Sequence, residues 1–374
     1  MYQGSVAIST LKLIDPKSKK IVSRNRWHYA VELSRLLQDL HYQVTWFQIG
    51  NGWKSQLIPG VTLCGVLRDG PQLFTWPQTS DDFYEKTHAF EWTIYFDLIL
   101  AYPQVHENSI AVSHGIWWDD PLSESNLPTE AEREEWKRRL WIALKSPQKV
   151  VSVESGLIHW ATATWPGLYH TFEYIPGFVP TWVDEASSGI PEFPKSSEAS
   201  VKILFSGALT PEAGISETIR AMEVLLETDP SFEFYLSGEG SEASIKFLAE
   251  WSGKYPQSHF HPGAVSQQTL AQMDLVLFPD KCCQETGMSC LAAMSLGKPV
   301  VVGQNSGLSD LVIPDHNGIV INPTDQDLIN VIRHLAGQPE FRCRLGENAR
   351  NVAQCYTLPV WRQRWQRLIE KTFR

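Results

Sequence analysis

Short apolar runs alternate with segments of helical periodicity along this chain, and one segment near the middle interrupts this alternation most clearly. Such alternation predicts parallel sheets whose strands are connected by crossover helices. Over residues 184–200 the periodicity vanishes and small residues, prolines and charges dominate, so this segment is the predicted linker. In the first half, the predicted strands are residues 5–9, 44–48, 61–66, 97–101, 109–113 and 150–153, with a helix over residues 27–40.

After the linker, the same pattern restarts with a strand that ends at Gly207. The other predicted strands are residues 232–240, 275–280, 299–304 and 318–322, and the predicted helices are residues 215–226, 289–296, 326–335, 340–354 and 359–372. The sequence therefore predicts an α/β protein with two Rossmann-like, doubly wound domains that face each other across a cleft. We place the N-terminal domain at residues 1–183 and the C-terminal domain at residues 201–355. The helix within residues 356–374 is expected to return to the N-terminal domain.

Composition limits the classes of partner. The 374 residues carry a formal net charge of −10, which argues against nucleic acid as a partner. The start of the sequence lacks the order of a signal peptide, and no apolar run reaches the ~18 residues of a membrane span. We therefore expect a cytoplasmic protein with at most peripheral membrane contact. Lys137, Arg138 and Arg139 could make such a contact, but a solvated helix face is the favoured interpretation of these residues. The six cysteines contain no CxxC pair; we expect buried thiols, with a redox pair at Cys282 and Cys283 as the alternative.

Eight segments of the second half occur together in a characteristic order and spacing. They are FSGALTPEAG (205–214), YLSGEG (235–240), FHPGAVSQQTL (260–270), DLVLFPD (274–280), QETGMSCLAAMSLGKPVVVG (284–303), SGLSDLV (306–312), NGIVI (317–321) and RLGENAR (344–350). The matching segments of the first half are WHYAVELSRLL (27–37), HYQVTWF (41–47), VSHG (112–115) and YIPGFV (174–179). In these segments the chain resembles the retaining glycosyltransferases of group 1, which have the GT-B fold.

The resemblance implies a metal-independent retaining transferase of the hexosyltransferase type. The donor substrate would be a nucleoside-diphosphate sugar bound by the C-terminal domain, and no cofactor is implied. A sugar, glycan, peptide or lipid acceptor would bind to the N-terminal domain. Arg, Lys and a helix N-terminus can stabilise the leaving diphosphate without a metal ion. The residues implied in catalysis are His114 and Glu285. Those implied in donor binding are Gly207, Gly214, Gly238, Val265, Gln284, Thr286, Gly287, Met288 and Ser289.

The sequence departs from the family pattern at four positions. The arginine and the lysine that hold the diphosphate in the family are replaced by Ala208 and Ala213. Two family glutamates, separated by seven residues, fall on Gln284 and Ala292, and Glu285 is adjacent to the first of these positions. Losing one oxyanion-type donor costs roughly 10²–10³ in rate. The sequence therefore predicts an altered donor site.

Five residues of the first half are candidates for the acceptor or phosphate side. Arg24, Arg26 and His28 stand where the family has a Gly-Gly loop. Arginine binds phosphate bidentately, although a solvated loop is the alternative. Trp117 and Trp118 are a predicted acceptor-binding pair, because flat aromatic rings suit sugars and peptides. We predict that this pair lies at the interdomain cleft and that at least one ring is partly exposed.

Two hypotheses about function remain open at this point. The first is an active retaining glycosyltransferase with an altered donor site. The second is a catalytically inactive GT-B-like subunit that binds an acceptor protein or partners an active glycosyltransferase. The only Asp-x-Asp sequence, residues 325–327, is interpreted as the start of a helix rather than as a metal site.

Overall fold

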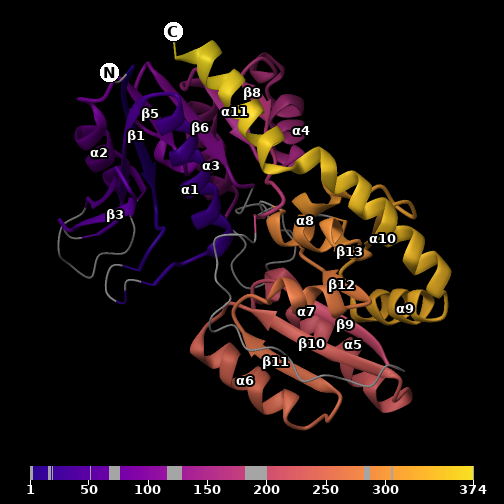
Figure 1. Cartoon of the computed structure of the whole chain (residues 1–374). Helices are drawn as coiled ribbons and strands as arrows, with labels where there is room; N and C mark the ends of the chain where they lie inside the picture. Colours follow the sequence, from indigo (N-terminus) through magenta and orange to yellow (C-terminus); the bar gives the residue numbers. More distant parts are fainter. Residues whose placement is uncertain are drawn as a thin grey trace. The chain divides into compact units, whose positions relative to one another are not determined.

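The computed structural model describes residues 3–15, 18, 20–50, 52–66, 76–115, 129–181, 200–281, 287–304 and 306–373. The chain divides into two compact units. Unit 1 comprises Met1–Pro176 and Trp361–Arg374, and unit 2 comprises Gly177–Val360 (Figure 1). Nearly all of the predicted linker lies outside the described residues. Among the described residues, no helix combines the length and the apolar character needed to cross a membrane.

Unit 2 is built on a six-stranded parallel sheet with the order β11-β10-β9-β12-β13-β14. This order runs outward in both directions from β9 and β12, so the topological switch point lies between these two strands. The strands are β9 (Val201–Ser206), β10 (Phe232–Gly238), β11 (Ser258–Pro262), β12 (Leu275–Phe278), β13 (Val300–Gly303) and β14 (Gly318–Ile321). The helices are α5 (Ile215–Thr228), α6 (Glu242–Ser252), α7 (Gln267–Gln272), α8 (Met288–Ser295), α9 (Asp325–Ala336) and α10 (Pro339–Ala353).

Both faces of this sheet are covered by helices. Ile203 and Phe205 belong to a buried cluster with residues of α5, α6 and α9, whereas Leu204 belongs to a second cluster with residues of α7, α8 and α10. Successive side chains of a strand point to opposite faces, so the continuous buried apolar run ILF (203–205) is what a sheet buried on both sides requires.

Unit 1 is built on an eight-stranded sheet with the order β3-β4-β2-β1-β5-β6-β7-β8. The strands are β1 (Gly4–Thr10), β2 (Tyr42–Gln48), β3 (Lys54–Ile58), β4 (Val61–Gly65), β5 (Trp92–Tyr95), β6 (Ser109–Ser113), β7 (Lys149–Ser152) and β8 (Phe172–Tyr174). Only β3, which pairs with β4, is antiparallel. The helices are α1 (Arg24–Asp39), α2 (Trp76–Thr87), α3 (Glu130–Lys145) and α4 (Ser155–Thr164). The switch point of this sheet lies between β1 and β5.

The last helix, α11 (Leu358–Thr372), packs on α1 within unit 1. Trp365 is fully buried, and its indole N–H donates to the Tyr29 hydroxyl over 2.9 Å. Arg362 pairs with Glu32 and with Asp39. The Phe373 ring, just beyond the helix, stacks on Trp92 with 4.0 Å between the centroids.

Two expectations from the sequence are wrong. The predicted strand at residues 97–101 is instead a short 3-10 helix, Leu98–Leu100, and the strand of this region is β5. Periodicity alone does not separate a short buried strand from a buried helical turn. In the structure, Asp97 lies beyond the end of β5, where its carboxylate makes the contacts described below. The cysteines are not uniformly buried: Cys290 is buried, but Cys343 and Cys355 are exposed, while Cys282 and Cys283 lie outside the described residues.

Candidate functional site

In unit 2, the loops that follow β9 and β12 contact each other at the switch point. Gly214 has a φ of +75°, and a Cβ at this position would overlap the carbonyl oxygen of Pro279. The backbone N–H of Lys281 donates to the carbonyl of Glu212 over 2.8 Å. Only glycine allows both the left-handed backbone and this close approach. The two loops therefore form one surface at the carboxyl edge of the sheet, where doubly wound sheets bind their ligands.

The N-terminus of α8 lies at the same edge. Gly287, the residue before the helix, has a φ of +73°, and a Cβ there would lie 2.8 Å from Leu311 Cδ1. The first turn contains Met288, which is fully buried, and Ser289, and it contains no acidic residue. The backbone N–H groups that open a helix and the helix dipole both favour an anion. This arrangement can hold a phosphate group.

The remaining predicted donor residues have different surroundings. Gly207 and Gly238 lie back to back, since a Cβ on Gly238 would overlap the Gly207 carbonyl oxygen. Val265 is 8% exposed and belongs to the hydrophobic core of unit 2. Gln284, Glu285 and Thr286 lie outside the described residues. The structure therefore brings Gly207, Gly214, Gly238 and Gly287 to loops at the carboxyl edge of the sheet.

The two alanines that replace the family cations are part of the packing. Ala213 is 5% exposed and belongs to the core cluster on the α5 face, and Ala208 packs against the same cluster. A long cationic side chain at Ala213 would have to leave this apolar contact. The cation that sequence reasoning did not single out is Lys281. Its signal was available in the sequence, because it directly follows the Pro279–Asp280 pair that ends the predicted strand.

In unit 1, His114 directly follows β6 in an aromatic environment. Its ring centroid lies 4.6 Å from that of Phe96 and 5.9 Å from that of Tyr29. Neither ring nitrogen has a hydrogen-bond partner of normal geometry among the described residues, and both are buried. Burial lowers the pKa of His114 to about 3, and the positive charge of Arg26 acts in the same direction. His114 is therefore a neutral imidazole at pH 7.

Asp97 organises the switch point of unit 1. Its carboxylate accepts hydrogen bonds from Thr10 Oγ1 over 2.8 Å and from the Leu11 N–H over 2.7 Å, and it lies 2.6 Å from Arg26 Nη2. Burial would raise the pKa of Asp97, but the charge of Arg26 and these hydrogen bonds hold it below its usual value. Asp97 is thus a buried carboxylate that sequence reasoning missed, because its partners are distant in sequence.

The basic residues of the first half are not in a loop, which corrects the sequence interpretation. Arg24, Arg26 and His28 lie in the first turns of α1, whose N-cap is Ser23. The pairing with Asp97 commits the Arg26 guanidinium inside unit 1, so that phosphate would have to compete with a buried carboxylate for it. The predicted acceptor residues Trp117 and Trp118 lie outside the described residues.

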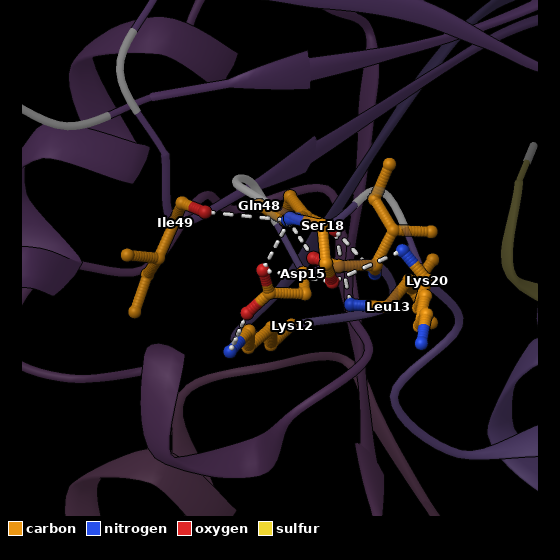
Figure 2. A network of polar contacts seen from close by, with 8 residues as sticks. Lys12, Leu13, Asp15, Ser18, Lys20, Gln48 and Ile49 are labelled. Atoms are coloured by element: carbon orange, nitrogen blue, oxygen red, sulfur yellow. Dashed lines mark hydrogen bonds and ion pairs between the residues drawn. The ribbon is translucent and has the colours of Figure 1, made fainter.

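The described residues of the connection between β1 and α1, which we call the strap, are held by polar contacts (Figure 2). Gln48, the last residue of β2, accepts the N–H groups of Leu13 and Ile14 over 3.0 Å each, and it donates to the Ile14 carbonyl over 2.8 Å. Ile14 and Ile21 form an antiparallel bridge, and Lys12 pairs with Asp15 at 2.9 Å. A buried amide thus satisfies the backbone of the strap, so no glycine is required there.

The Asp-x-Asp sequence is confirmed as the start of α9. Thr324 is the N-cap, its hydroxyl accepts the Asp327 N–H over 3.1 Å, and Asp325 and Asp327 lie in the first turn. Among the residues that the structure describes, no three His, Cys, Asp or Glu side chains are grouped as metal ligands.

Comparison with known proteins concerns mainly unit 2. Residues 190–352 match the family model of "Glycosyl transferases group 1". The resemblance of this chain to the group 1 glycosyltransferases is thereby confirmed for most of unit 2. An uncharacterized glycosyltransferase of Methanocaldococcus jannaschii is 28% identical over 160 residues, which are 41% of this chain and 43% of that protein. The matches to the curated relatives cover from 33% to 43% of their lengths.

Solved structures show the same fold. A sucrose-phosphate synthase from Thermosynechococcus elongatus superposes with a TM-score of 0.73 at 16% identity, covering 99% of each chain. HepE of Anabaena, solved in complex with UDP-glucose, superposes with a TM-score of 0.68 at 14% identity, covering 99% of this chain and 100% of that one. At these identities the likeness concerns the fold. The α/β fold of this chain is that of the GT-B glycosyltransferases.

Proposed function

We propose that this chain transfers a sugar from a nucleoside-diphosphate sugar to an acceptor, with retention of configuration and without a metal ion. The observation that carries this proposal is the left-handed Gly287, which opens α8 at the switch point inside the segment that matches the family model. An acid-free helix N-terminus at that position is suited to the diphosphate. The HepE structure, which has the same fold, contains UDP-glucose.

In the proposed reaction, unit 2 binds the donor, and the resemblance alone assigns His114 to the sugar. Gly207 and Gly214 lie in the loop after β9, where Gly214 lets this loop contact the loop after β12, and the first turn of α8, with Met288 and Ser289, holds the diphosphate. A neutral imidazole can accept or donate one hydrogen bond to a sugar hydroxyl without adding charge. We propose this role for His114, whose buried nitrogens have no hydrogen-bond partner of normal geometry among the described residues. Glu285, Gln284 and Thr286 are assigned to the sugar by sequence alone.

The experiment that tests this function begins with binding. The full chain is heated with and without UDP-glucose, UDP, GDP-mannose, GDP and ADP-glucose. A ligand at about 100 times its Kd stabilises the fold by ~2.7 kcal/mol, which is an easily measured rise in Tm. The ligand that binds is then used as donor in the presence of EDTA, and the anomeric configuration of the product is read by NMR.

Three outcomes separate the possibilities. Turnover with retention in EDTA supports the proposal. Donor binding without turnover against any acceptor would favour the inactive-subunit hypothesis. If none of these nucleotides changes the Tm, the proposed function is wrong.

A further inference from the structure

The carboxyl edge of unit 2 is almost devoid of positive charge. Between the end of each strand and the helix that follows it, the printed sequence of this unit contains a single lysine or arginine, Lys281. The first turns of α5, α6, α7, α8 and α9 contain no basic residue either. A bound diphosphate carries at least two negative charges, and a helix N-terminus supplies only about half of one positive charge. Lys281 is therefore the cation that these loops and first turns contribute at the edge; Arg220, from the second turn of α5, also reaches it but is shared between Glu217 and Asp325.

Lys281 stands at the switch point itself. It lies three residues beyond the end of β12, and its backbone N–H is hydrogen-bonded to Glu212 in the loop after β9. Its side chain is only 16% exposed, and its ammonium lies 2.9 Å from Glu217 Oε2 in the first turn of α5. The partly buried ammonium of Lys281 therefore lies beside the contact between the loops that follow β9 and β12.

The carboxylate that holds this ammonium has a second cation. Glu217 Oε1 lies 2.9 Å from Arg220 Nη2, and Arg220 Nε lies 3.5 Å from Asp325. Burial alone would raise the pKa of Glu217, but Lys281 and Arg220 outweigh it and lower the pKa. If the ammonium moved away, Glu217 would still be paired with Arg220. The penalty for leaving a buried charge unpaired, which fixes most buried ion pairs, is therefore reduced here.

We propose that Lys281 is the cation that binds the diphosphate of the donor, and that Glu217 holds its ammonium at the edge of the sheet until the nucleotide binds. This inference rests on the proposed function. It assigns to the loop after β12 the charge that Ala208 and Ala213 no longer supply in the loop after β9. Movement of the ammonium from Glu217 to the diphosphate is electrostatically reasonable. Glu217 carries one negative charge and remains paired with Arg220, whereas the diphosphate carries at least two negative charges.

Binding of UDP, GDP and ADP, each compared with its nucleoside, tests the inference by titration calorimetry. Lys281→Met approximately keeps the length of the side chain and removes the charge. For the nucleoside diphosphate that binds the wild type, this substitution should weaken the affinity by about tenfold to a hundredfold. Binding of the nucleoside should be unchanged. Lys281→Arg should retain most of the affinity. Glu217→Gln frees the ammonium and should tighten diphosphate binding by about threefold or more.

The matched control is Lys298→Met. Lys298 is a partly buried lysine of the same unit, but it precedes β13 and so lies at the opposite, amino edge of the sheet, where its ammonium donates to the Ala271 carbonyl. Its substitution should leave diphosphate affinity unchanged.

The outcomes distinguish this inference from the function on which it rests. If the wild type binds none of the three diphosphates, both are overturned. If the wild type binds one and Lys281→Met binds it equally well, only the role of Lys281 is overturned. If Lys281→Met and Glu217→Gln weaken binding alike, the pair is a structural link and the inference is again overturned. Opposite effects of the two substitutions support it, because a purely structural pair would not produce them.

Discussion

Gly214 and Gly263 both have backbone angles in the left-handed region, with φ of +75° and +94°, but their surroundings differ. A Cβ at position 263 would meet nothing within 4 Å, whereas one at position 214 would overlap the carbonyl of Pro279. Gly263→Ala should cost about 1–2 kcal/mol, the penalty of a left-handed L-residue. Gly214→Ala should cost at least about 2 kcal/mol more, because the loops after β9 and β12 must separate.

Urea unfolding of both variants measures these costs, and Gly167→Ala serves as the reference because a Cβ there also meets nothing within 4 Å. Equal destabilisation by Gly214→Ala and Gly263→Ala would contradict the close contact between the two loops.

His114 predicts a dependence of stability on pH. Its pKa falls from an unfolded value of about 6.5 to about 3 in the folded chain. Between these two values the unfolded chain binds the proton and the folded chain does not, so lowering the pH through this window favours unfolding. The stability associated with the neutral imidazole is complete above pH 6.5 and is lost progressively toward pH 3.

The free energy of unfolding of the wild type should therefore fall more steeply between pH 6.5 and pH 4 than that of His114→Gln, which has no titrating ring. Asp97 and the other carboxyl groups are present in both proteins, so the difference between the two curves isolates His114. Parallel curves would mean that the imidazole can be protonated in the folded chain.

For single residues, the sequence predicts the conformation where that conformation depends only on neighbouring residues. Gly287 lies just before the predicted helix over residues 289–296, and in the structure it directly precedes α8 with a left-handed angle, which is a property of a few adjacent residues. Asp97 and Glu217 could not be found this way. Asp97 becomes a buried anion only through Arg26 and Thr10, which the fold brings to it, and no local pattern reports such a pairing.

Helix α11 is attached to α1 by contacts that can be tested in pairs. Trp365→Phe removes the indole N–H that bonds to the Tyr29 hydroxyl, and Tyr29→Phe removes the acceptor. Each single change leaves a buried polar group without this partner and should cost about 1–3 kcal/mol. The double variant should cost less than the sum, with a coupling of at least about 0.5 kcal/mol.

Chemical unfolding of the four proteins gives this coupling directly. Trp361 lies with its ring centroid 4.9 Å from that of Tyr29 and is left unchanged in all four. Additive effects would mean that the bond between α11 and α1 contributes nothing measurable.

Most elements of unit 2 were predictable because most of its strands contain apolar runs and its longer helices are amphipathic. Strand β11, with the sequence SHFHP, has no such run and was not predicted, and neither were α6 and α7. The apolar run at residues 97–101, by contrast, misled the prediction. Leu98 and Leu100 are buried in either conformation, so hydrophobicity did not distinguish the 3-10 turn from a strand. Strands β3 and β8 have few fully buried residues, and a pattern of burial could not reveal them.

At the scale of the whole chain, the proposed function predicts which amides a nucleotide protects. In hydrogen exchange with saturating nucleoside diphosphate, peptides that contain residues 207–214 and 287–291 should exchange more slowly, because these loops and the first turn of α8 are the proposed diphosphate site. Peptides from the amino edge of the same sheet, around Lys298, should not change. Protection that spared residues 287–291 would contradict the assignment of α8.

The path of the chain has a consequence for how this protein is made. Unit 1 is assembled from residues 3–176 and from residues 361–373, which are separated by all of unit 2. During synthesis, the first half leaves the ribosome before the aromatic residues that cover Tyr29 have been translated, and unit 2 can finish folding first. Until then, part of the apolar surface of unit 1 stays exposed to solvent. Nascent chains with exposed apolar surface are prone to aggregation and are bound by chaperones. A ribosome that stops before codon 361 would release a protein in which unit 2, the proposed nucleotide-binding unit, is complete and unit 1 is not.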